Sequence, residues 1–105
     1  MKEVTVQELK SMRDNKESFQ LIDVREPHEA EIASIGGELI PMGSIMNEST
    51  RIEKEKPVII HCRSGARSAS VIQALEKQHG FTNLFNLKGG ILAWAKEIDP
   101  TMPTY

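Results

Sequence analysis

The sequence predicts a single α/β domain built around a largely parallel sheet. Short apolar runs that suit buried strands alternate along the chain with segments of helical spacing, and parallel strands need such helices to connect them. A chain of 105 residues is long enough for one hydrophobic core and leaves no room for a second domain. We therefore expect residues 1–105 to form one domain, with a frayed tail over 99–105, which contains two prolines.

The first half of the chain is expected to contain three helices and two strands. Thr5 and Glu8 match a capping box, which marks the start of a helix. The run FQLIDV is mostly apolar and bounded by polar residues, as expected for a central strand covered on both faces. Pro27 suits the first turn of a helix, because its missing N–H has no partner there. We predict a helix over 6–14, a strand over 19–24, a helix over 28–33, a strand over 38–40 and a helix over 44–52.

The second half of the chain is expected to alternate strand, helix, strand and helix. The run PVIIH is a second candidate for a buried strand, and Ala69, Ile72 and Leu75 recur after it at helical spacing. Gly80 is placed to end that helix. We predict a strand over 57–61, a helix over 66–79, a strand over 83–87 and a helix over 91–97.

The composition excludes several classes of function. With a net charge of −2 and no block of lysine and arginine, the chain is not expected to bind nucleic acid. No apolar stretch approaches the ~20 residues that span a membrane, and the N-terminus lacks the apolar core of a secretory signal, so we expect a soluble, cytoplasmic protein. A lone cysteine excludes an internal disulfide, and the three histidines show no metal-ligand spacing with it. We expect neither a metal nor a cofactor.

The lone cysteine, Cys62, lies where an α/β sheet places its ligands. It follows a predicted strand and precedes the longest predicted helix, and ligand sites in open α/β sheets lie at the carboxyl ends of the strands. Gly65 permits a tight curl, so the backbone N–H groups after the cysteine can surround its sulfur. Those groups, the helix dipole and the nearby Arg63 or Arg67 favour the thiolate, which is the nucleophilic form. We therefore expect a reactive, ionised and solvent-reachable thiol.

The segment 62–68, called the cysteine loop below, is the predicted site. Two arginines near one thiol suit a small oxyanion. Ser68 either donates to the sulfur or caps the following helix, and the sequence leaves both roles open. His61 is expected to pack on the opposite face of the strand, because successive side chains alternate. The predicted nucleophile is Cys62, and the predicted substrate-binding residues are Arg63, Ser64, Gly65, Ala66, Arg67 and Ser68.

Three motifs give the chain a resemblance to a known family. LIDVREPHE at 21–29, VIIHCRSGARS at 58–68 and NLKGGILAW at 86–94 occur in the order found in the rhodanese-like domain, the family of single-domain sulfurtransferases. The resemblance implies a three-layer α/β/α sandwich around a five-stranded, mainly parallel sheet, with Cys62 as the sulfur-accepting nucleophile. It also implies that Asp23 and Arg25 are framework residues, and we expect Arg25 to pair with an acid such as Glu29 or Glu31.

The resemblance further implies a two-step reaction. Cys62 would take a sulfane sulfur from a small anionic donor such as thiosulfate, and its persulfide would pass that sulfur to a thiophile such as cyanide, a thiol or an acceptor protein. No second cysteine is present to resolve the persulfide, so the acceptor must come from outside. The segment ASIGGELIP at 33–41 departs from the common family pattern and looks like rhodanese domains found beside ubiquitin-like-protein activating enzymes. That likeness adds a sulfur-carrier protein to the acceptors that the sequence leaves open.

Three other functions compete with sulfur transfer. Cysteine-dependent phosphatases carry a pattern like His-Cys-x5-Arg, whereas this chain has Cys-x4-Arg from Cys62 to Arg67. The shorter loop suits a single sulfur atom better than a phosphoryl group. Arsenate reduction is disfavoured by the absence of shuttle cysteines. A non-catalytic regulatory or binding module is disfavoured by the presence of the cysteine itself.

Overall fold

The computed structural model describes residues 1–105 and confirms the predicted α/β class. Its five strands form one sheet in the order β1-β5-β4-β2-β3, and every neighbouring pair is parallel. The strands are β1 (Glu3–Val4), β2 (Gln20–Asp23), β3 (Glu38–Leu39), β4 (Val58–His61) and β5 (Leu84–Leu87). The helices are α1 (Val6–Asp14), α2 (Pro27–Ile32), the 3-10 helix η1 (Ile45–Arg51), α3 (Ala66–His79) and α4 (Gly90–Glu97).

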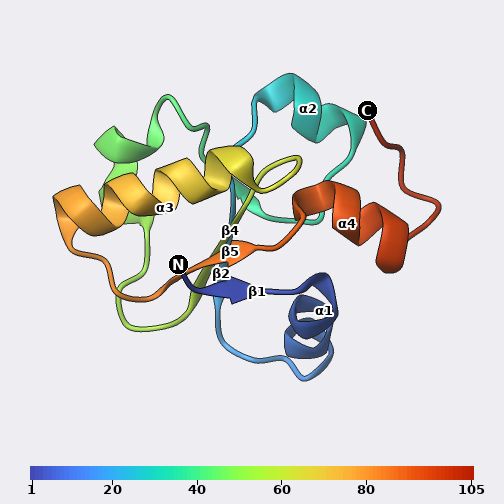
Figure 1. Cartoon of the computed structure of the whole chain (residues 1–105), viewed down its shortest axis with the longest axis horizontal. Coiled ribbons are helices and arrows are strands. Elements are labelled where there is room, and N and C mark those ends of the chain that lie inside the picture. Colours follow the sequence, from blue (N-terminus) through green and yellow to red (C-terminus); the bar gives the residue numbers. More distant parts are fainter.

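Helices cover both faces of the sheet, which gives the three expected layers (Figure 1). One hydrophobic cluster joins the sheet to α3 and η1 through residues such as Ile72, Leu75 and Ile45. The other joins the opposite face to α1 and α4 through residues such as Leu9 and Trp94. A parallel sheet buried on both faces explains why its central strands read as unbroken apolar runs.

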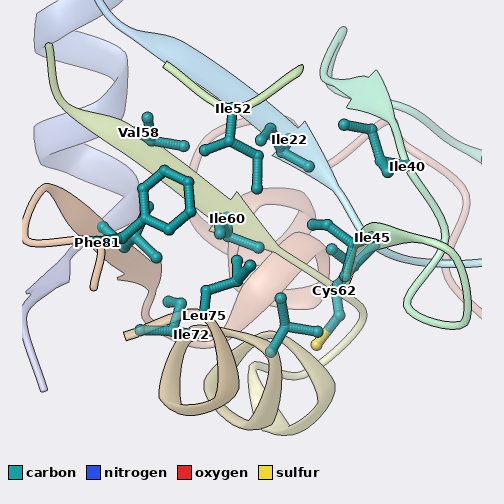
Figure 2. Packing of buried hydrophobic residues seen from close by; sticks show 13 residues of the cluster. Ile22, Ile40, Ile45, Ile52, Val58, Ile60, Cys62, Ile72, Leu75 and Phe81 are labelled. Atoms are coloured by element: carbon teal, nitrogen blue, oxygen red, sulfur yellow. The ribbon is translucent and has the colours of Figure 1, made fainter. Parts of the chain in front are cut away.

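Strand β4 shows how the alternation of side chains places the cysteine. Val58, Ile60 and Cys62 belong to the cluster under α3, whereas Ile59 belongs to the cluster under α1 and α4. Figure 2 shows Ile60 and Cys62 within the first cluster, with the cysteine sulfur beside α3. His61, which is fully buried, therefore faces away from the cysteine side chain, as predicted.

Three features differ from the sequence predictions. Strand β1 was not predicted, because two residues carry no periodic signal. The segment expected as a helix over 44–52 is a 3-10 helix, and its backbone leaves helical geometry at Glu48. The tail expected to be frayed is held instead: Met102 and Tyr105 pack against the second cluster, and the Tyr105 hydroxyl forms hydrogen bonds with Arg25 and Glu29. None of the helices is both long and apolar enough to cross a membrane.

Candidate active site

The cysteine loop runs from the end of β4 into the first turn of α3, which begins at Ala66. The amides of Ile91 and Leu92, in the first turn of α4, donate hydrogen bonds to the carbonyls of Cys62 (3.0 Å) and Arg63 (3.1 Å). Gly90 allows this close approach, since a Cβ there would lie only 2.5 Å from the Arg63 carbonyl oxygen. The helix after the last strand therefore holds the backbone of Cys62 in place.

Hydrogen-bond donors converge on the Cys62 sulfur. The amides of Gly65 and Ser68 donate to Sγ at 3.1 and 3.5 Å, and the Ser68 hydroxyl lies 3.4 Å from it. Gly65 adopts a φ of +106°, which a residue with a side chain rarely adopts, and it is the N-cap from which the chain continues into α3. Of the two roles left open for Ser68, the geometry supports contact with the sulfur, because no side-chain cap is formed at the start of α3.

These donors favour the ionised form of the cysteine. Burial by itself raises the pKa of Cys62, but the Ser68 hydroxyl and the amides of Ser68, Gly65 and Ser64 outweigh it, so the pKa lies below its ordinary value. A thiolate that accepts several hydrogen bonds is the reactive form of cysteine. The predicted cradle of N–H groups is therefore present around the sulfur.

The expectation of a solvent-reachable thiol is not met. Cys62 is only 1% exposed and is packed in the hydrophobic cluster that includes Val71 of α3 and Ile45 of η1. In Figure 2 its sulfur lies beside α3. The side chains of Ser64 and Ala66 lie on the exposed outer side of the loop. The sulfur thus lies beneath the cysteine loop, because the same curl that supplies its donors also covers it.

Asn86 of β5 completes the loop, and the sequence analysis missed it. Its side-chain amide donates to the carbonyl of Gly65 at 3.1 Å, and its Oδ1 lies 2.5 Å from the Ser68 hydroxyl oxygen, so it shares the single hydroxyl proton of Ser68 with the Cys62 sulfur. It is only 5% exposed. The sequence signal for Asn86 is a polar residue within an otherwise apolar strand, because a buried side-chain amide needs hydrogen-bond partners.

The two arginines of the cysteine loop have different surroundings. Both terminal nitrogens of Arg67 donate to the Glu29 carboxylate, each at 2.8 Å. Arg63 is half-buried, has no carboxylate within ion-pair distance, and lies over the Tyr105 ring at 5.1 Å. Arg67 was predicted to hold an anionic donor, but in the structure both terminal nitrogens of its guanidinium group bind Glu29.

The pairing predicted for Arg25 is wrong. Its guanidinium binds the carboxylate of Asp23, with a closest distance of 2.7 Å, and both side chains are buried. Of the two acids expected as partners, Glu29 offers Arg25 only its backbone carbonyl oxygen, because its carboxylate binds Arg67. Glu31 lies exposed on α2. Arg25 also donates to the Ala33 carbonyl at 2.8 Å. The pair joins the end of β2 to the middle of α2, at Glu29, and to the residue that follows it, Ala33, which is the kind of contact a framework residue makes.

His61 lies next to this pair without joining it. Its Nε2 is 3.9 Å from an Asp23 oxygen and has no hydrogen-bond partner. Burial lowers the pKa of His61, partly offset by the Asp23 charge. A neutral, buried imidazole on the face opposite the sulfur is suited to packing, in agreement with the sequence interpretation.

The pH dependence of alkylation tests the thiolate. We expect the rate of Cys62 modification by iodoacetamide to rise with pH through a midpoint below about 8.5, the usual value for a free thiol. The plateau rate should be lower than that of a free thiol of similar pKa, because the sulfur is covered. Intact-mass kinetics from pH 5 to 10 measure both quantities, and a midpoint above 8.5 would contradict the role of the loop donors.

Comparison with known families places the chain among related sequences. The family model of the rhodanese-like domain matches residues 5–97. A sulfurtransferase of Allochromatium vinosum is 37% identical over 95 residues, which cover 90% of this chain and 88% of that protein. The putative sulfurtransferase YtwF of Bacillus subtilis is also 37% identical, with 95% and 96% covered.

A longer relative and a solved structure are also similar to this chain. The probable adenylyltransferase/sulfurtransferase MoeZ of Mycobacterium tuberculosis is 37% identical over 97% of this chain, which spans only 26% of that protein. The crystal structure of a rhodanese-like domain protein from Staphylococcus aureus superposes with a TM-score of 0.82 and 30% identity, covering 100% of this chain and 99% of the other. The fold is therefore shared with that solved structure along the whole length of this chain.

Proposed function

The chain belongs to the rhodanese-like domain family, and on that premise we propose that it is a sulfurtransferase that carries a sulfane sulfur on Cys62. The observation that supports this most is the convergence of the Gly65 and Ser68 donors on a single sulfur atom. A persulfide at this position would present a second sulfur to the same ring of N–H groups. That arrangement stabilises negative charge on either sulfur without a metal or cofactor.

The proposed reaction has two steps. The Cys62 thiolate attacks the outer sulfur of a small donor such as thiosulfate; a new S–S bond forms, the donor S–S bond breaks, and its electron pair leaves with sulfite. A thiophile such as cyanide or a thiol then attacks the outer sulfur of the persulfide, and the thiolate is restored. The cysteine loop must open to admit either molecule, because Cys62 is covered in the resting structure.

The acceptor must be an external molecule. Cys62 is the only cysteine, so no internal thiol can take the sulfur. A relative of which this chain spans a quarter is named an adenylyltransferase/sulfurtransferase. Together with the ASIGGELIP segment, that name favours a sulfur-carrier protein as the physiological acceptor, with cyanide or a small thiol as its substitute in an assay.

Intact-mass measurement after brief treatment with thiosulfate tests the function. We expect the protein to gain the mass of one sulfur atom, to lose it on addition of a reductant or cyanide, and to release thiocyanate in the second case. p-Nitrophenyl phosphate serves as the control substrate, because a phosphatase would turn it over. Phosphatase turnover without any sulfur adduct would overturn the proposal.

A further inference from the structure

The charges around the cysteine loop are almost fully paired. Arg25 is bound by Asp23 and Arg67 by Glu29, so each of these cations already has a carboxylate partner. Arg63 is the remaining arginine of the loop, and no carboxylate lies within ion-pair distance of it. A donor that approaches the sulfur therefore meets one unpaired guanidinium rather than the two that the sequence offers.

Glu29 is held so that it cannot easily release Arg67. One oxygen of its carboxylate accepts hydrogen bonds from Arg67 and from the Tyr105 hydroxyl, both at 2.8 Å. The other accepts from the second Arg67 nitrogen at 2.8 Å and from the backbone N–H of Glu26 at 2.9 Å. Its side chain is only 9% exposed. The Arg67 fork holds the pKa of Glu29 well below its usual range, against the opposing effect of burial, so this carboxylate stays ionised.

A fixed negative charge beside Arg67 matters for the donor. Thiosulfate carries two negative charges and must approach a thiolate that carries a third. A hydropersulfide, R–S–SH, carries none on its sulfur atoms and at most one after losing its proton. Because like charges repel and the charge of Arg67 is already neutralised by Glu29, the free energy needed to approach the thiolate is higher for a donor of higher negative charge.

We propose that Glu29 is a positioning residue that sets the charge of the preferred sulfur donor: by holding Arg67, it disfavours dianionic donors and favours persulfides of low charge. This inference rests on the proposed sulfurtransferase function. The transfer is balanced without an added oxidant. The Cys62 thiolate attacks the outer sulfur of R–S–SH, the donor S–S bond breaks, its electron pair leaves with R–S⁻, and the proton stays on the transferred sulfur.

Loading kinetics on variants of the full chain test this proposal. The rate constants for persulfide formation at Cys62 are measured by rapid quench and intact mass, with thiosulfate and with the hydropersulfide of 2-mercaptoethanol. In E29Q, which removes the negative charge paired with Arg67, we expect the ratio of the thiosulfate to the hydropersulfide rate constant to rise about fivefold at low salt. The rise should shrink as ionic strength increases. The ratio cancels changes that affect both donors equally, such as a shift in Cys62 ionisation.

Matched variants separate a charge effect from a structural one. E31Q makes the same charge change at an exposed position of α2 and should leave the ratio unchanged. The double variant E29Q/R67Q also removes the positive charge of Arg67 and should return the ratio to that of the unmodified chain. Y105F removes one hydrogen bond to Glu29, keeps the ring over Arg63, and should raise the ratio about twofold; it provides the test if E29Q folds poorly.

The outcomes distinguish this proposal from the function on which it rests. If neither donor adds sulfur to Cys62 in the unmodified chain, the sulfurtransferase function itself fails. If both donors load but the ratio is the same in E29Q and Y105F, or rises equally in E31Q, the role of Glu29 is overturned while the function stands.

Discussion

Replacing Cys62 with serine is expected to abolish sulfur transfer, with a loss of at least about a thousandfold in rate. The serine hydroxyl stays protonated at neutral pH and cannot form a persulfide, so neither step of the reaction remains. The loop should persist, because the new oxygen meets the same donors, the amides of Gly65 and Ser68. We therefore expect at most about 2 kcal/mol of lost stability. Thiocyanate release and chemical denaturation measure the two quantities.

The matched control for this variant is Ser70→Ala. Ser70 is exposed on α3, two residues beyond the last residue of the cysteine loop, and makes no contact with the sulfur. Its removal should change neither the rate nor the stability by a measurable amount. Sulfur transfer at the original rate in Cys62→Ser would show that the reaction does not pass through this residue, and the entire mechanism would be wrong.

The order of the elements follows from local pattern, which is why the sequence predicts it. Ile22 and Ile60 lie at the centre of apolar runs and are fully buried in β2 and β4. The apolar residues of α3 recur on one face, and Gly80 ends that helix with a φ of +69°. Such features depend on neighbours a few residues away, so periodicity and turn residues reveal them.

The features that the sequence does not reveal depend on distant contacts. Strand β1 exists because Glu3 and Val4 pair with residues of β5 more than eighty positions later. Tyr105 is held because its hydroxyl meets Arg25 and Glu29, which are also distant along the chain. A tail with two prolines has no periodic signal, and only the assembled fold supplies the partners that order it.

The same distinction holds at the candidate site. The curl of the cysteine loop is local, so Gly65 predicts it and the structure shows it. The supports of the loop are remote: Asn86 comes from β5, and Glu29 comes from α2. Burial of the sulfur is likewise a property of the packed layers, because Cys62 shares its hydrophobic cluster with residues of two different helices, such as Ile45 and Val71. Sequence reasoning therefore predicts the curl of the loop around Cys62 better than the access of solvent to its sulfur and the charges around it.

Gly90→Ala is expected to have the largest effect on folding among single changes at the site. A Cβ at residue 90 would lie 2.5 Å from the carbonyl oxygen of Arg63 and 2.7 Å from that of Cys62, and both are backbone atoms that cannot rotate away. The backbone φ of +59° adds a conformational cost for any residue with a side chain. From the close contacts and the positive φ together, we expect Gly90→Ala to lower the free energy of unfolding by about 2–4 kcal/mol.

Activity should fall with stability, because the displaced atoms belong to the nucleophile. The alanine would push the cysteine loop away from α4, weaken the bonds from the Ile91 and Leu92 amides, and move the Cys62 sulfur from its donors. Gly80→Ala is the matched control: its φ of +69° is similar, but nothing lies within 4 Å of its Cβ. In Gly80→Ala we expect only the loss of stability that the backbone conformation causes, with an unchanged rate of thiosulfate loading. In Gly90→Ala we expect a larger loss of stability and a lower loading rate, and denaturation midpoints and loading kinetics measure the two. Equal losses in the two variants would show that contact between α4 and the loop does not position the nucleophile.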